Sequence, residues 1–114
     1  MDIKQIEELA AKNKPLPEGM KMGEVYFYKI MQMLYHQLRN GDIDKDTAAR
    51  EKREAVHALN DMAVYEQAAG NVEQWKAVAR AMSEYDSNRT IENADVLWTA
   101  IFGFGFVRYE AGGT

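Results

Sequence analysis

The sequence predicts an all-α protein, a small bundle of four to five helices in which consecutive helices pack antiparallel. Three observations predict this fold class. Apolar residues recur at spacings of three and four along most of the chain. No stretch alternates between apolar and polar residues as a strand would, and both prolines lie in one short segment, 14–19. The 114 residues suffice for one domain with one modest core, and the absence of cysteine excludes disulfides.

The first expected helix, at about 2–12, is short and carries a single apolar stripe: Ile3, Ile6, Leu9 and Ala10. A proline-containing linker separates it from the rest, so we expect it to form only if that stripe docks. The expected organisation is one helical domain, with an N-terminal helix at 1–13, a Pro/Gly linker at 14–23, a helical core at 24–105 and a tail at 106–114.

The second expected helix, at about 23–40, is apolar over well over half of its circumference. Its apolar side chains are Tyr26, Phe27, Tyr28, Ile30, Met31, Met33, Leu34, Tyr35 and Leu38. Such a helix is either central in its fold or shared with a second subunit. The remaining strip is polar, and Gly41 is the expected left-handed terminator.

Three further helices have recognisable starts. Asp44 is the expected cap of a helix that runs to about 69, and Asn71 and Thr90 are the expected caps of the last two. Each has an apolar stripe. The three stripes are Ala48, Ala55, Val56, Leu59, Met62 and Ala63; Trp75, Val78, Met82 and Tyr85; and Ile91, Ala94, Leu97, Trp98 and Ile101.

The composition argues against several function classes. There is no thiol nucleophile, and neither Ser83 nor Ser87 lies in a G-x-S-x-G turn, so we expect no enzyme. His57 and Asp61 lie four residues apart on one helix face and could share a cation, but the chain has no H-x-x-x-H pair and no loop dense in oxygen ligands, so we expect no metal and no cofactor. A net charge of −4 disfavours general binding to nucleic acids. No apolar run approaches the roughly 20 residues of a membrane span, and the first residues lack a signal-peptide core, so we expect a cytoplasmic protein.

The expected binding residues lie on two consecutive helices. Tyrosine rings beside lysine and arginine suit a nucleotide-like anion, because rings stack on a base and cations meet phosphates. We expect stacking from Tyr28 and Tyr35, phosphate contacts from Lys29, Arg39, Arg50 and Arg53, and a polar contact from His36. The alternative is that these side chains form an ordinary solvated bundle surface.

Lys52 is unusual because it lies in line with the apolar positions of the third helix. A lysine in such a place either extends its ammonium to water or meets an anion.

The chain is rich in large apolar side chains, with four Phe, six Tyr, two Trp and seven Met. The tail adds Phe102, Phe104 and Phe106 to the wide apolar arc of the second helix. Self-association would cover this surface, so a homo-oligomer is expected, with burial inside the monomer as the alternative.

Several segments together resemble a group of small, uncharacterised helical proteins carried by prophages of gut Firmicutes. They are LPEGM at 16–20, YFY at 26–28, LY at 34–35, RNGDI at 39–43, AAREK at 48–52 and ENADVLW at 92–98. The resemblance implies a phage accessory protein that acts in the host cell by binding. The expected function is counter-defence, with an oligomeric sponge that sequesters a nucleotide immune signal. The alternative is a protein–protein inhibitor of a host defence complex such as a CRISPR effector, acting through the acids at 42–46 or the apolar tail.

Overall fold

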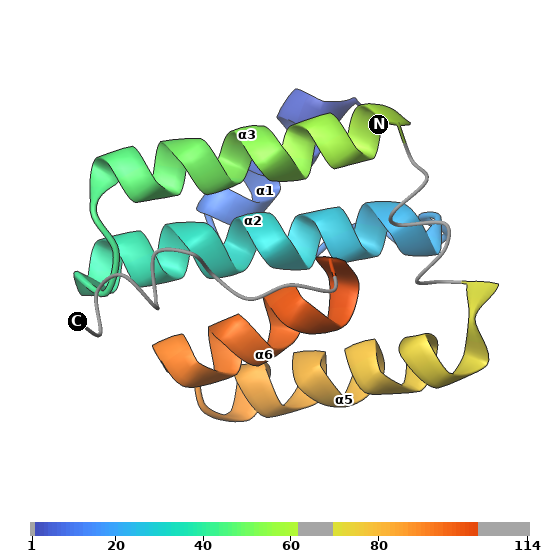
Figure 1. Cartoon of the computed structure of the whole chain (residues 1–114). Coiled ribbons are helices and arrows are strands. Elements are labelled where there is room, and N and C mark those ends of the chain that lie inside the picture. Colours follow the sequence, from blue (N-terminus) through green and yellow to red (C-terminus); the bar gives the residue numbers. More distant parts are fainter. Residues whose placement is uncertain (1, 62–69, 103–114) are drawn as a thin grey trace.

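The computed structural model describes residues 2–61 and 70–102, with the side chains of 58–61 left out (Figure 1). These ranges contain five α-helices and no strand, which confirms the all-α bundle. The helices are α1 (Ile3–Ala11), α2 (Met22–Asn40), α3 (Lys45–Asp61), α5 (Val72–Ser87) and α6 (Ile91–Phe102). None of them is both long and apolar enough to cross a bilayer.

Helix α2 lies in the middle of the bundle (Figure 1). It packs against α1, α3 and α6, while α5 packs mainly against α6. In Figure 1, α3 runs antiparallel to α2 on one side, the antiparallel pair α5 and α6 lies on the other, and α1 crosses behind. The connections 41–44 and 88–90 are short, and short connections favour the antiparallel packing of α2 with α3 and of α5 with α6.

The apolar arc of α2 is covered within the monomer. Its fully inaccessible side chains are Tyr26, Phe27, Ile30, Met31 and Met33. Of the two interpretations of so wide an arc, a central position in the fold is the one observed. The short helix α1 docks on this core through Ile6 and Ala10, which are also fully buried, as its apolar stripe predicts.

Polar side chains and one glycine set the helix ends where the sequence predicts them. Gly41 ends α2 in the left-handed region at φ 83°. The side chains of Asp44, Asn71 and Thr90 accept hydrogen bonds from the free backbone N–H groups at the starts of α3, α5 and α6. The rest of the third expected helix, as far as 69, lies outside the described residues.

One residue of the expected core is misplaced by the sequence pattern. Trp75 keeps 42% of its surface exposed, whereas Val78 and Tyr85 on the same stripe are buried. The neighbouring Gln74 donates to the carbonyl oxygens of Ala100 and Ile101, so the last turn of α6 lies beside the first turn of α5. Trp75, the next residue in the first turn of α5, is only partly covered.

Candidate functional site

The polar strip of α2 faces other parts of the chain. Lys29, an expected phosphate contact, places its Nζ 2.8 and 3.0 Å from the two carboxylate oxygens of Asp86 on α5. The same ammonium donates to Gln32 Oε1 at 2.9 Å, and the lysine side chain is only 13% exposed. Its charge and its hydrogen bonds are therefore engaged within the fold.

Further hydrogen bonds and an ion pair join the strip to the linker and to the loop between α5 and α6. Gln32 Nε2 donates to Asn13 Oδ1 at 2.6 Å, which joins α2 to the linker. Arg89, in the loop between α5 and α6, reaches Asn13 Oδ1 at 3.5 Å and Asp86 Oδ1 at 3.6 Å. We call the strip and its partners the polar seam: Asn13, Lys29, Gln32, His36, Arg39, Tyr85, Asp86 and Arg89.

At the other end of the seam lie His36 and Arg39. The imidazole meets the ring of Tyr85 edge-on, with 6.4 Å between centroids. Burial lowers the pKa of His36, and the positive charges of Arg89 and Arg39 lower it further, so the neutral form is favoured at neutral pH. Arg39 Nη1 donates to the carbonyl oxygen of Ala11 at 2.9 Å, at the end of α1 where unpaired carbonyls attract cations.

The two expected stacking tyrosines lie in different surroundings. Tyr28 is buried, and its hydroxyl donates to the carbonyl oxygen of Lys14 at 2.5 Å. Its ring is therefore a core side chain that fixes the linker. Tyr35 is half-buried beside α3, and its hydroxyl donates to Glu7 Oε2 at 2.6 Å.

The remaining expected phosphate contacts, Arg50 and Arg53, are exposed on α3. Arg50 Nε lies 3.9 Å from the buried carboxylate of Glu51, its neighbour in the chain. Arg53 lines an open depression with its neighbour His57.

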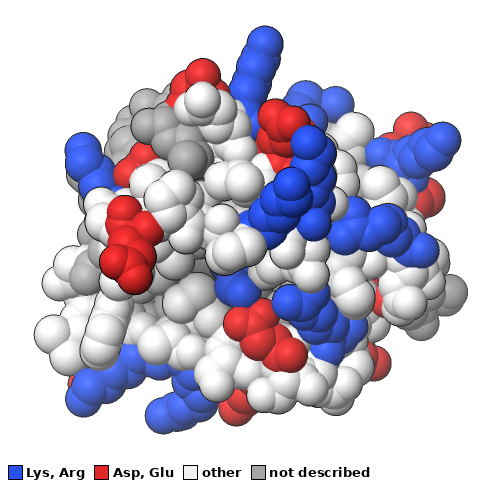
Figure 2. Space-filling view, turned by 180° about the vertical axis from the view of Figure 1, so that it is seen from behind, with Lys and Arg blue, Asp and Glu red and all other residues white. Residues whose placement is uncertain are grey.

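The seven expected binding residues thus fall into separate places, and the structure does not bring them together in one recess. In the face shown in Figure 2, lysine and arginine side chains lie at several places with acidic side chains among them. Of the seven, Tyr35 lines the recess that does lie between the two consecutive helices.

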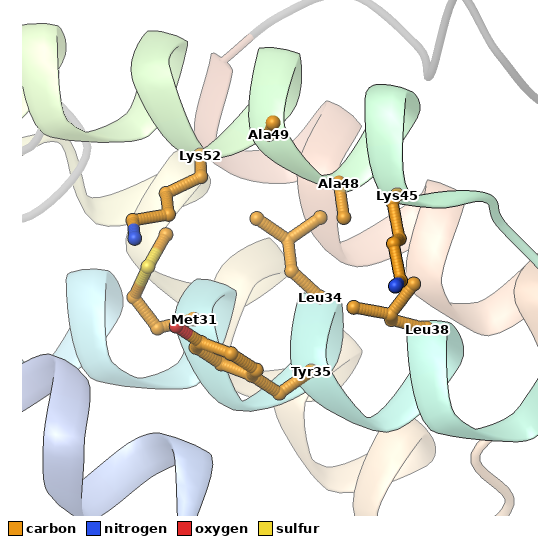
Figure 3. A pocket seen from close by; sticks show the side chains of 8 residues that line it. All are labelled: Met31, Leu34, Tyr35, Leu38, Lys45, Ala48, Ala49 and Lys52. Atoms are coloured by element: carbon orange, nitrogen blue, oxygen red, sulfur yellow. The ribbon is translucent and has the colours of Figure 1, made fainter.

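That recess is a groove of about 200 Å³ between α2 and α3 (Figure 3). Its wall is mostly apolar, and a lysine stands toward each end. The groove residues are Met31, Leu34, Tyr35, Leu38, Lys45, Ala48, Ala49 and Lys52. The small Ala48 and Ala49 side chains leave the space between the helices open (Figure 3). Lys45 is exposed and has no ion-pair partner within the described part of the chain.

At one end of the groove Lys52 meets an anion, one of the two outcomes expected for a lysine in its position. Its Nζ lies 2.5 Å from Glu7 Oε2, the oxygen that also accepts the hydrogen bond from Tyr35. Burial raises the pKa of Glu7, but the hydrogen bonds from Lys52 and Tyr35 and the charge of Lys52 outweigh burial and hold it below its ordinary value. The Glu7 hydrogen bond correspondingly raises the pKa of Lys52.

Sequence reasoning missed three residues that matter here: Glu7, Lys45 and Arg89. Lys45 had a usable signal, because it lies seven residues before Lys52 and so falls on the same face of its helix. Glu7 and Arg89 had none, since each reaches its partners across a linker or from a loop that no periodicity describes.

Comparisons with known proteins add no assignment: no family model, no curated protein and no solved structure matches the chain. Within the described residues, no three His, Cys, Asp or Glu side chains gather as metal ligands would.

We expect Lys29→Met to lower the free energy of unfolding by about 1–2 kcal/mol, because the Asp86 carboxylate and the Gln32 amide oxygen lose their partner. Denaturant unfolding measures this loss of unfolding free energy. Lys76→Met, on the exposed face of α5, is the control. Equal small effects of the two substitutions would contradict a structural role for Lys29.

The contacts of Glu7 predict that the free energy of unfolding depends on pH. Its folded pKa lies below the ordinary value of 4.5, so its ion pair stabilises the fold above that value and the contribution is lost as the pH falls below it. Glu7→Gln should therefore cost about 1 kcal/mol at pH 7, and the difference from the unchanged protein should shrink between pH 5 and 3. A difference that stays constant over this range would contradict the assignment. Glu8→Gln, which removes an exposed pair with Lys12, is the control for the size of the effect and should cost less at pH 7.

Proposed function

We propose that the protein is a non-enzymatic binding protein that captures a small anion with an apolar body in the groove between α2 and α3. One observation carries the proposal: two lysines flank an apolar wall in a recess between helices. Lys45 and Lys52 are seven residues apart on α3, which separates them by about 10 Å along the helix. An apolar body over Leu34 and Ala48 would leave its acid group within reach of an ammonium.

The size of the groove narrows the ligand. Drug-sized molecules occupy pockets of about 300–1,000 Å³, whereas this groove measures about 200 Å³. One ring system with one acid group fits such a volume. A nucleotide would place a single part here, its base on the apolar wall and a phosphate on a lysine, with the remainder outside.

The biological role that we propose for this site comes from the resemblance to prophage proteins. A phage accessory protein with such a groove would serve counter-defence as a sponge for a nucleotide immune signal. The apolar arc of α2 does not support an oligomer, because α1, α3 and α6 cover this arc within the monomer. Self-association is instead proposed from the exposed Trp75 and from the aromatic residues at 104 and 106, which lie outside the described residues.

A second candidate function is inhibition of a host defence protein by direct contact. Trp75 and Val72 lie three residues apart on one face of α5 and are 42% and 64% exposed. Exposed tryptophan is typical of the centre of protein–protein interfaces. The acids at 42–46 are the other expected contact. Two of them already have partners at helix ends, because Asp42 accepts a hydrogen bond from Gln37 and Asp44 caps α3.

Thermal unfolding tests the first function, using cyclic nucleotides and ADP-ribose as ligands. At a concentration one hundred times its Kd, a ligand stabilises the folded state by about 2.7 kcal/mol, which raises Tm by several degrees. Lys45→Glu should abolish the rise, whereas Lys76→Glu on α5 should leave it unchanged. In a second experiment the protein is expressed in cells with active defence systems, purified and denatured by heat. Mass spectrometry of the released small molecules should find the ligand chemically unaltered.

Two results would contradict this function. One is no rise in Tm with any of these nucleotides together with no small acid in the released fraction. The other is an altered ligand in that fraction, which would indicate an enzyme. Copurification of a host protein that is lost in Trp75→Ala would establish the second candidate instead.

A further inference from the structure

We infer that Glu7 is an internal competitor, whose carboxylate occupies the acid-binding position of the groove until an anionic ligand displaces it. The inference rests on the proposed function and adds to it the chemistry of one end of the site. Two donors from two different helices, the Lys52 ammonium and the Tyr35 hydroxyl, converge on the single oxygen Oε2 of Glu7, at 2.5 and 2.6 Å.

This convergence is the geometry that recognises an acid group. An ammonium and a hydroxyl that donate to one carboxylate oxygen can donate equally to a carboxylate, phosphate or sulfonate oxygen of a ligand. Both donors belong to the groove wall (Figure 3), and Glu7 belongs to α1. Glu7 is therefore the one member of the contact that a ligand can replace while the groove itself stays intact.

The docking of α1 does not depend on this carboxylate. Ile6 and Ala10 are fully buried in the core, and Arg39 holds the carbonyl oxygen of Ala11. The side chain of Glu7 is 20% exposed, so rotation about its own bonds can carry it into water while α1 remains in place.

Competition by a tethered group sets the selectivity of the site. A group held by a short connection acts at an effective concentration in the millimolar range. Acetate, phosphate and other small anions below that range will not displace Glu7, because they offer only the same single contact. A ligand needs an apolar body over Leu34 and Ala48 as well, or a second acid for Lys45.

Naphthalene-1-sulfonate is a suitable probe, because it joins a two-ring apolar body to an acid that stays charged at every working pH. If Glu7 holds the position about nine-tenths of the time, its removal strengthens apparent binding about tenfold. We expect Glu7→Ala to bind the probe about tenfold more tightly than the unchanged protein by calorimetry. Glu8→Gln, one residue along α1, should leave the affinity unchanged, and Lys52→Gln should weaken it.

The neutral 1-naphthol is the matched ligand control, and its affinity should not change in Glu7→Ala. If Glu7→Ala fails to fold, Glu7→Gln removes the charge and keeps a side chain of the same size. If the Glu7 variants bind the probe as tightly as the unchanged protein, or more weakly, Glu7 does not compete with the ligand, but the groove remains a binding site. No binding of the probe to any of these proteins would overturn the competitor together with the groove as an anion site.

Discussion

The burial of α2 is the constraint on which the rest of the structure depends. Five of its large side chains are completely inaccessible, and each contributes about 1.5–3 kcal/mol when buried. No single neighbour can cover a helix that is apolar over so much of its circumference. The positions of α1, α3 and α6 around it follow from that requirement, and so does the docking of the short helix α1 across a linker that carries two prolines.

Covering α2 on most sides also encloses its polar strip, and enclosed polar groups must find partners. The polar seam meets this requirement with side chains from the linker and from α5. Within the seam, Lys29 pairs with Asp86 and Gln32 donates to Asn13. The buried hydroxyl of Tyr85, also in the seam, donates to Gln37 of α2 at 2.6 Å. Burial raises the pKa of this hydroxyl well above its ordinary value. Of the residues that look most like a nucleotide site in the sequence, those on α2 are thus engaged in holding segments of the chain together, whereas Arg50 and Arg53 are exposed on α3. The groove between α2 and α3 is left with an exposed cation, Lys45.

The helices and the caps of α3, α5 and α6 could be predicted from the sequence, because these features depend on residues close together in the chain. The wide apolar arc of α2 could be predicted as well, but the sequence left open whether the fold or a second subunit covers it. The candidate site could not be predicted in the same way. Lys29 and Asp86 are 57 residues apart, and Glu7 reaches Lys52 from beyond the linker. Periodicity places Lys29 and Lys52 on a helix face but does not say what faces them. The same limit applies to Trp75, because periodicity places it on the stripe of α5 but does not say how much of its ring a neighbour covers.

The proposed ligand binds in one location, the groove between α2 and α3, and a methyl-resolved NMR titration with naphthalene-1-sulfonate tests that location most directly. We expect the largest shifts on the methyl groups of Leu34, Leu38, Ala48 and Ala49, which line the groove. Shifts centred on the methyl groups of Val72 beside Trp75, with the four groove residues unmoved, would contradict this location.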